Sequence, residues 1–544
     1  MTAEPTVADV VGSLLAELGV GHAFGVVGSG NFHVTNALRE HGVPFTAARH
    51  ECGAATMADA FARTSGEVAV VTLHQGCGLT NALTGITEAA KSRTPLLVLA
   101  ADTGGAAVRS NFRIDQDLLV TSVGAVPERV HSAASAVADV LRAYETCRGQ
   151  RRTVVLNLPL DVQKQPCVPA TAQFAARFPA RPGVAAVAAL AELLDHAERP
   201  VFIAGRGARH AGPELAALAD TCGALLATSA VANGLFSGHP WALGIAGGFA
   251  TDLAVELITD ADLVVAWGAS LTSWTTRHGA LLGESATVVQ VDDTPAALGA
   301  QLPVDLAVLG DVAEAARDVA ALVTGGGAGY RSPAIGARIA AEGRWAQIPE
   351  PEQDPDPERI DPRTLSAALD ALLPVERTVA VDSGNFMGYP SAYLAVPDVA
   401  GFCFTQGFQS IGLGLATALG AALARPDRLT VAALGDGGLL MGIAELETAV
   451  RLGVRMLIVV YDDAGYGAEF HHFAGADHTT VRFPETDLAA IAEGYGATAA
   501  TVRCTADLDA VRSWLDGHPS GPMLVDAKVR ADEPSWWLAE AFRG

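Results

Sequence analysis

The 544-residue sequence predicts an α/β protein made of three doubly wound, parallel-sheet domains. Short apolar runs alternate with longer stretches whose apolar residues recur at helical spacing, which is the pattern of repeated β-α-β units. Connectors rich in Pro, Ala, Gly or acidic residues occupy positions 163–183, 324–329 and 349–362. Such breaks mark boundaries between compact regions. We therefore place the three domains at residues 1–165, 183–325 and 355–544.

The first region should open with a helix over residues 7–18 and continue as alternating strands and helices. Its expected strands span 23–27, 44–48, 67–73, 96–101 and 153–158. In a parallel sheet, functional groups gather at the carboxyl ends of the strands. Three of the expected strands lead into the polar stretches Gly28-Ser29-Gly30-Asn31, Arg49-His50-Glu51 and His74-Gln75-Gly76.

The second region carries expected strands at 200–204, 261–266 and 286–291. A dinucleotide-binding unit usually has the pattern G-x-G-x-x-G between its first strand and helix. The nearest stretch here, Gly205 to His210, does not match that pattern clearly. We therefore do not expect this region to bind FAD.

The most informative stretch lies in the third region, between Val431 and Gly467. An apolar strand at 431–434 leads into the turn Gly435-Asp436-Gly437-Gly438, and then into a helix over 443–452. A second apolar strand at 456–460 ends in Asp462 and Asp463. Glycines and a helix N-terminus suit phosphate oxygens, and carboxylates suit Mg²⁺. The stretch therefore indicates a metal-bound diphosphate, with an ordinary β-α-β crossover whose strands end in acids as the alternative.

Composition excludes several other classes of function. The net charge of −24 and the absence of a basic patch argue against nucleic acid as a partner. No apolar run reaches the ~18 residues of a membrane-spanning helix, so we expect no membrane partner. Seven Cys without a C-x-x-C pair, and an N-terminus without the features of a signal peptide, lead us to expect a cytoplasmic protein with reduced thiols.

The complete 431–467 stretch resembles the signature of thiamine-diphosphate (ThDP) enzymes. The three-region layout resembles the branch that contains pyruvate oxidase, acetolactate synthase and benzoylformate decarboxylase, with pyrimidine-binding, middle and diphosphate-binding domains. The resemblance implies that Asp436, Asp463 and the carbonyl of Gly465 bind Mg²⁺. The same segment would bind the diphosphate through four further residues: Gly435, Gly437, Gly438 and Tyr466. Asp463 departs from the family pattern, which usually has Asn there.

Glu51 carries the second resemblance. It follows His50 at a strand end and precedes an Ala-rich helix, as does the family glutamate that exchanges a proton with the cofactor's aminopyrimidine ring. Read without that context, Glu51 would be an acid that complements the dipole of a helix N-terminus. In the family, this glutamate and the metal ligands serve one cofactor from different subunits. The resemblance therefore implies a homodimer or homotetramer with shared active sites.

Two further segments match family loops. In residues 405–414, Ile411 would support the bent cofactor, and the Gln409 carbonyl would accept a hydrogen bond from its 4′-amino group; a Gly-rich helix start in a buried core is the alternative. Three residues after another apolar strand would line the diphosphate pocket: Asp382, Gly384 and Asn385.

Candidate proton-transfer groups come from both ends of the chain. Ser29 and His74 resemble a Ser and His pair in benzoylformate decarboxylase, although a lone His at a strand end is more often structural. Glu469 lies where pyruvate decarboxylases place an active-site glutamate. We also assign His471 to the substrate cleft, with His472 as the alternative because adjacent side chains diverge.

These features together imply ThDP- and Mg²⁺-dependent cleavage or formation of a C–C bond on a 2-oxo acid. Protonation after CO₂ loss would make the protein a decarboxylase, whereas addition to a carbonyl acceptor would make it an acetolactate-synthase-like carboligase. Two alternatives stay open at this point. One is an FAD-containing oxidase, and the other is a catalytically silent scaffold subunit of the same fold.

Overall fold

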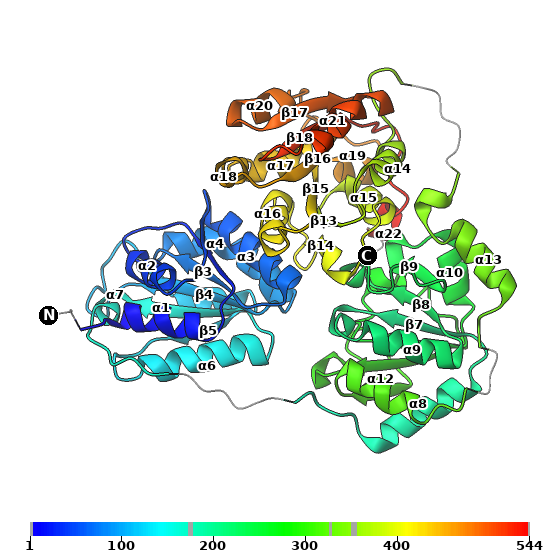
Figure 1. The fold of residues 1–544 in the computed structure, drawn as a ribbon, viewed down its shortest axis with the longest axis horizontal. Helices are drawn as coiled ribbons and strands as arrows, with labels where there is room; N and C mark the ends of the chain where they lie inside the picture. The colour runs from blue at the N-terminus through cyan, green and yellow to red at the C-terminus, as the bar shows by residue number, and fades with distance from the viewer. Residues whose placement is uncertain (1–3, 172–177, 326–328, 350–355, 542–544) are drawn as a thin grey trace.

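The computed structural model describes residues 4–171, 178–325, 329–349 and 356–541 (Figure 1). Within these residues, three six-stranded sheets form, and every strand pair within them is parallel. The predicted fold class is therefore confirmed. In Figure 1 the first sheet lies at the left, the second at the lower right, and the third above and between them.

The first sheet has the strand order β2-β1-β3-β4-β6-β5. Its elements are α1 (Val7–Glu17), β1 (His22–Gly25), α2 (Phe32–Glu40), β2 (Phe45–Ala47), α3 (Glu51–Ser65), β3 (Ala69–Leu73), α4 (Cys77–Lys91), β4 (Leu96–Asp102), α5 (Gln116–Ser122), β5 (Val126–Arg129), α6 (Ala136–Gly149), β6 (Val154–Pro159) and α7 (Leu160–Gln163). The strand expected at 153–158 is thus the sixth in the chain and not the fifth, because β5 precedes it.

The second sheet has the order β12-β11-β10-β7-β8-β9. Its elements are α8 (Val184–His196), β7 (Pro200–Ala204), α9 (Gly212–Cys222), β8 (Leu225–Thr228), β9 (Ala242–Ile245), α10 (Asp252–Thr259), β10 (Leu263–Trp267), α11 (Ser273–Thr276), β11 (Thr287–Asp292), β12 (Leu306–Leu309), α12 (Val312–Ala320) and α13 (Pro333–Glu342).

The third sheet has the order β14-β13-β15-β16-β18-β17. Its elements are α14 (Pro362–Leu372), β13 (Arg377–Val381), α15 (Gly388–Tyr393), β14 (Phe402–Phe404), α16 (Gly414–Ala424), β15 (Leu429–Gly435), α17 (Asp436–Gly442), α18 (Glu445–Leu452), β16 (Met456–Asp462), α19 (Gly467–His472), α20 (Leu488–Tyr495), β17 (Thr498–Val502), α21 (Asp509–Gly517), β18 (Met523–Lys528) and α22 (Leu538–Ala541).

The glycine-rich stretch after β15 differs from its predicted form. The sequence predicts a turn over 435–438, but residues 436–442 form the short helix α17, and the next helix begins at Glu445 and not at Ile443. Glycine disfavours helix in isolation. Close packing nevertheless favours glycine at both positions, because a Cβ on Gly437 would meet the Tyr466 ring at 2.6 Å and one on Gly438 would meet Asp382 Oδ2 at 2.5 Å.

The first and third domains share one apolar core. A single cluster of buried side chains joins Met57 of α3 and Leu79 of α4 to Leu415 and Leu419 of α16. Helices α3 and α16 cross closely enough that a Cβ on Gly420 would meet the Met57 carbonyl oxygen at 2.1 Å. Figure 1 shows this contact where the blue and yellow helices meet. The two domains are therefore held in a fixed orientation by packing and not by the connectors.

Candidate active site

A cavity of about 790 Å³ is lined by residues of all three domains, most of them from the third and the middle domain. Most of the predicted cofactor residues line it, and they come from the carboxyl ends of β13, β15 and β16 and from the loop before α16. They are Gly384, Asn385, Gln409, Ile411, Gly435, Asp436, Gly437, Gly438, Asp463, Gly465 and Tyr466. Because these strands are neighbours in one parallel sheet, their carboxyl ends meet at a single edge.

Asp382 lies beneath this cavity and does not line it. The side chain is fully buried, and its carboxylate accepts hydrogen bonds from the N–H groups of Ser383 (2.9 Å) and Gly412 (2.9 Å). Burial raises the pKa of Asp382 to about 6, although these hydrogen bonds oppose the shift. Asp382 therefore fixes the backbone of the cavity wall.

Two carboxylates in the cavity, Asp436 and Asp463, form no ion pair with any described residue, although the charge of Arg359 slightly opposes the rise in the pKa of Asp463. Burial, followed by the charge of Asp462, raises the pKa of Asp436 to about 7. Burial and then the charge of Asp436 raise the pKa of Asp463 well above its ordinary value. Lys528 does not relieve them, because its ammonium group pairs with Asp462 and, at 3.0 Å, with Asp526.

A hard divalent cation would fit between Asp436 and Asp463, since its charge would offset the cost of burying two carboxylates. Among the described residues, no group of three or more His, Cys, Asp or Glu side chains gathers as a self-sufficient metal site. A cation here would therefore need backbone oxygens, such as the Gly465 carbonyl, and oxygens of a bound ligand. The N-terminus of α17 and its glycines provide room and free N–H groups for an anionic ligand beside it.

The loop between β14 and α16 takes an unusual backbone conformation. Gln409 has a φ of 61°, in the left-handed region that non-glycine residues seldom adopt, and Gly412 has a φ of 89°. Gln409 and Ile411 both line the cavity. The left-handed turn at Gln409 directs the following residues back toward α16.

A second cluster of predicted residues forms in the first domain. Glu51 is the first residue of α3, and the Asn81 side-chain amide donates to its Oε2 at 3.0 Å. Ser29 Oγ and His74 Nε2 lie 3.5 Å apart. A Cβ on Gly78 would lie 3.2 Å from His74 Cβ and 3.6 Å from Glu51 Oε1, so His74 and Glu51 lie near one point, and Ser29 contacts the far side of the His74 ring. None of the three lines the 790 Å³ cavity.

The two predicted residues of helix α19, Glu469 and His471, lie in different surroundings. Glu469 lines the cavity. His471 is half-buried and does not line it; its ring packs on Phe470 with centroids 4.5 Å apart. Burial, followed by the charge of Arg482, lowers the pKa of His471. A catalytic role for His471 stays a prediction.

Several residues of the site have no signal in the sequence. Lys91, Arg93 and Arg151 of the first domain line the cavity, as does Trp537 near the C-terminus. Glu445 of α18 holds the loop before Glu51, since its carboxylate accepts from the N–H groups of Arg49 (3.1 Å) and His50 (3.0 Å). These residues belong to no motif, and only the packing of the domains brings them to the site.

The three domains match three family models in chain order. Residues 5–117 match the N-terminal TPP binding domain of thiamine pyrophosphate enzymes, 187–319 match the central domain, and 382–527 match the C-terminal TPP binding domain. Among the described residues, no helix has both the length and the apolar character needed to span a membrane.

Curated relatives cover almost the full chain at low identity. A sulfoacetaldehyde acetyltransferase from Rhodobacter capsulatus is 28% identical over 97% of this chain and 94% of its own length. A "Probable 2-ketoarginine decarboxylase" from Pseudomonas aeruginosa is 30% identical over 95% and 92% of the two chains. A "Probable acetolactate synthase large subunit" from Methanocaldococcus jannaschii is 26% identical over 90% and 86%.

A solved structure has the same fold. It is described as a "putative thiamin diphosphate-dependent enzyme" from Mycobacterium smegmatis and superposes with a TM-score of 0.80 at 23% identity, covering 97% of this chain and all of that one. The family models, together with a relative 30% identical over nearly the full length, agree with the geometry of the cavity. The chain therefore belongs to the thiamine-diphosphate-dependent enzyme family.

Proposed function

We propose that this protein is a ThDP- and Mg²⁺-dependent enzyme that cleaves a 2-oxo acid with loss of CO₂. The observation that carries the proposal is a pair of neighbouring carboxylates without an ion-pair partner among the described residues: buried Asp436 at the glycine-rich start of α17 and half-buried Asp463 just after β16. Such a pair is costly alone and is stabilised by a divalent cation that also binds a diphosphate. The named relatives, a decarboxylase, a synthase and acetyltransferases, support this class of chemistry.

Each candidate residue has a distinct role in this proposal. Bound thiamine diphosphate would supply a carbon nucleophile and an electron sink. Asp436, Asp463 and the Gly465 carbonyl would hold the cation, while Gln409 and Ile411 would orient the cofactor rings. Glu51 would exchange a proton with the aminopyrimidine nitrogen N1′.

The remaining candidates would act on the substrate. Ser29 and His74 would move a proton at the substrate carbonyl oxygen, because their side chains lie together beside Glu51. Glu469 would act from the cavity wall. Whether the product carbon is protonated or joined to a carbonyl acceptor depends on which molecule reaches it first, so both outcomes belong to the proposal.

We further propose that two copies of the chain complete each site. Glu51, Ser29 and His74 do not line the cavity that holds the candidate metal ligands of the same chain. Apolar side chains near both clusters are exposed: Phe32 is 51% exposed on α2, and Met441 is 56% exposed on α17. Exposed apolar faces of this kind favour a protein partner. A second copy would cover them and bring the two clusters together.

The test measures CO₂ release and products from a panel of 2-oxo acids, with and without ThDP and Mg²⁺. We expect CO₂ only with both cofactors, accompanied by an aldehyde or a 2-hydroxyketone. Glu51→Gln should lower the rate at least ~100-fold while ThDP still binds. Absence of ThDP binding in calorimetry would overturn the proposal and revive the scaffold alternative, and a flavin absorbance band would favour the oxidase.

A further inference from the structure

The cofactor loop, residues 405–412, is anchored at both ends. At its C-terminal end, Gly412 N–H donates to Asp382 within the third domain (2.9 Å). At the other end, the anchor comes from the first domain: Glu88 of α4 accepts from the N–H groups of Gly407 at 3.0 Å and Phe408 at 2.6 Å. One carboxylate thus binds two successive amides immediately before Gln409, the residue with the left-handed backbone.

The environment of Glu88 differs sharply from that of the loop it holds. Its side chain is 1% exposed, whereas Phe408 is 45% exposed. A Cβ on Gly407 would meet Ser92 Oγ at 2.6 Å and Glu88 Oε1 at 3.1 Å, so the backbone approaches as closely as a glycine allows. The exposed segment before Gln409 is therefore fixed to a rigid, buried acceptor in another domain.

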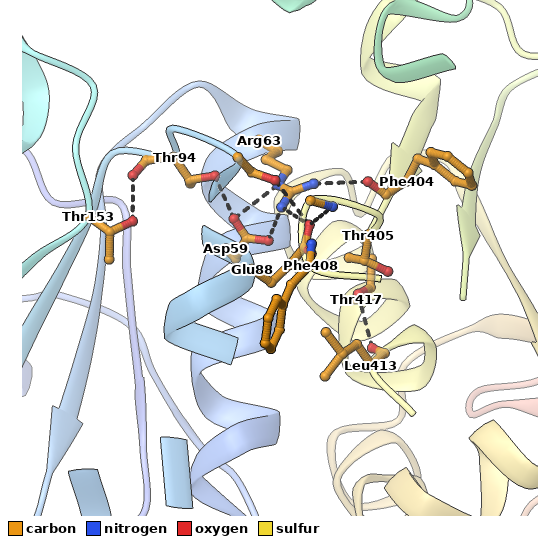
Figure 2. Close-up of polar contacts among 12 residues, drawn as sticks. Asp59, Arg63, Glu88, Thr94, Thr153, Phe404, Thr405, Phe408, Leu413 and Thr417 are labelled. Atoms are coloured by element: carbon orange, nitrogen blue, oxygen red, sulfur yellow. Dashed lines mark hydrogen bonds and ion pairs between the residues drawn. The ribbon is translucent and has the colours of Figure 1, made fainter. Parts of the chain in front are cut away.

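A buried ion network holds the Glu88 carboxylate in place (Figure 2). Arg63 of α3 donates to Glu88 Oε1 at 2.8 Å, to Asp59 Oδ1 at 2.9 Å, and to the Phe404 carbonyl at 3.0 Å. Asp59 also accepts from Thr94 Oγ1 at 2.6 Å. Burial acts to raise the pKa of Glu88, but the charge of Arg63 and the hydrogen bonds from Arg63, Phe408 and Gly407 outweigh it, so the pKa is lowered.

Asp59 and Glu88 therefore share a cation but have different neighbours. Both side chains are buried, and both pair with Arg63. Glu88 contacts the cofactor loop, whereas the hydrogen bonds of Asp59 go to Arg63 and Thr94. This difference allows the role of the loop contact to be separated from the role of the ion network.

We infer that Glu88 is a positioning residue for the cofactor loop, which it holds so that Gln409 and Ile411 present a preformed surface to the cofactor rings. The inference rests on the proposed function, because it concerns the same site. A residue in the left-handed region persists only where its surroundings hold it. Loss of the Glu88 anchor should let the loop leave that conformation, and ThDP would then have to order it on binding.

The experiment compares Glu88→Gln with Asp59→Asn in the full chain. Gln keeps the size of Glu88 but replaces one acceptor oxygen by an amide N–H₂ that faces a backbone N–H. We expect the Kd for ThDP, measured by calorimetry at saturating Mg²⁺, to rise about 10- to 100-fold in Glu88→Gln. Asp59→Asn should raise it no more than about threefold, although both variants weaken the same ion network.

Hydrogen exchange of the 405–412 segment without cofactor gives a second, independent readout. The Gly407 and Phe408 amides should exchange faster in Glu88→Gln than in the wild type and remain protected in Asp59→Asn. If Glu88→Gln does not fold, Glu88→Asp, which keeps the charge beside Arg63 but shortens the reach, should give the same pattern at about fivefold in Kd.

The inference would be overturned if Glu88→Gln binds ThDP with wild-type affinity and its Gly407 and Phe408 amides exchange at the wild-type rate. Equal effects of Glu88→Gln and Asp59→Asn would also overturn it. A wild-type protein that fails to bind ThDP would instead overturn the proposed function, and the exchange data would still decide whether Glu88 holds the loop.

Discussion

Asp463 places a second negative charge beside buried Asp436. Without a cation, the two carboxylates repel each other and have no ion-pair partner among the described residues, which lowers the free energy of unfolding. With a divalent cation bound, the extra charge strengthens the ion's attraction and opposes the diphosphate. A single residue can thus shift the balance between metal and cofactor affinity.

We predict that Asp463→Asn retains cofactor binding, with the Kd for ThDP changed by less than about tenfold. The amide oxygen still serves as a ligand, and the repulsion from Asp436 is removed. The apo protein should melt about 2 °C higher, since it no longer buries two like charges. Calorimetry and thermal melts with and without Mg²⁺ measure both quantities, and complete loss of ThDP binding would show that Asp463 is not the ligand assumed here.

Burial of His22 should make the free energy of unfolding depend on pH in the acid range. Its ring packs on Phe24 and Phe61 with centroids at 4.5 and 5.3 Å, and burial lowers its pKa to about 4. The unfolded chain, with a pKa near 6.5, binds the proton more readily. The contribution of His22 is therefore fully present above pH ~6.5 and is lost as the pH falls toward 4.

In melting curves recorded between pH 4 and 7, His22→Gln should flatten this part of the pH dependence, which amounts to on the order of 2 kcal/mol at its acid limit. His196→Gln, at an exposed position on α8, serves as the control and should leave the pH profile of the wild type unchanged. An unaltered slope in His22→Gln would contradict the assignment.

At the scale of elements, the crossing of α3 and α16 joins two parts of the site. Helix α3 carries Glu51 at its start and Arg63 near its end, and α16 follows directly on the cofactor loop. The crossing is close because Gly420 has no Cβ to hold it away from the Met57 carbonyl. Any residue larger than glycine must push the helices apart and disturb both the shared core and the loop.

We therefore predict that Gly420→Ala lowers the stability by about 1–3 kcal/mol, as overpacked cores do, despite the better helix propensity of Ala. Gly494→Ala provides the matched control. Gly494 lies in helix α20, and nothing within 4 Å would meet its Cβ. That substitution should be neutral or stabilising by up to ~1 kcal/mol. In thermal and denaturant unfolding, Gly420→Ala should unfold earlier than the wild type and Gly494→Ala should not; equal destabilisation of both variants would contradict this account.

The elements differ in how well the sequence predicts them. Strands such as β4 and β16 are buried on both faces, so they appear as continuous apolar runs. The edge strands β5 and β17 are only half-buried and carry no such run, which is why the sequence does not predict them. Gly437 and Gly438 form part of a helix that local propensity disfavours, and Tyr466 and Asp382 leave no room for a Cβ at either position.

The candidate site shows the same division. Asp436, Asp463 and Gln409 lie in motifs, and the sequence alone predicts their presence in one pocket. Glu88 contacts Phe408 across 320 positions of sequence, and its position within α4 carries no local signal. Residues that act through such long-range contacts become visible only when the packing of the domains is known.

At the scale of the whole molecule, the third domain is the centre to which the other two attach. It shares one apolar core with the first domain and another with Phe249 of the middle domain. The cavity is lined mostly by the third and middle domains, while Glu51, Ser29 and His74 of the first domain do not line it. In the proposed function, one chain therefore carries the two halves of a site at different places, and each half would complete the site of a partner.

This arrangement predicts complementation between two inactive chains. Glu51→Gln and Asp436→Ala should each be inactive as homodimers, because every site lacks one essential group. When the two chains pair, one site of the heterodimer combines both lesions and the other combines an intact Glu51 with an intact Asp436. Heterodimers isolated with two different affinity tags should regain about half of the wild-type activity per dimer, and a random mixture about a quarter. If each site used Glu51 and Asp436 of the same chain, heterodimers would stay as inactive as their parents.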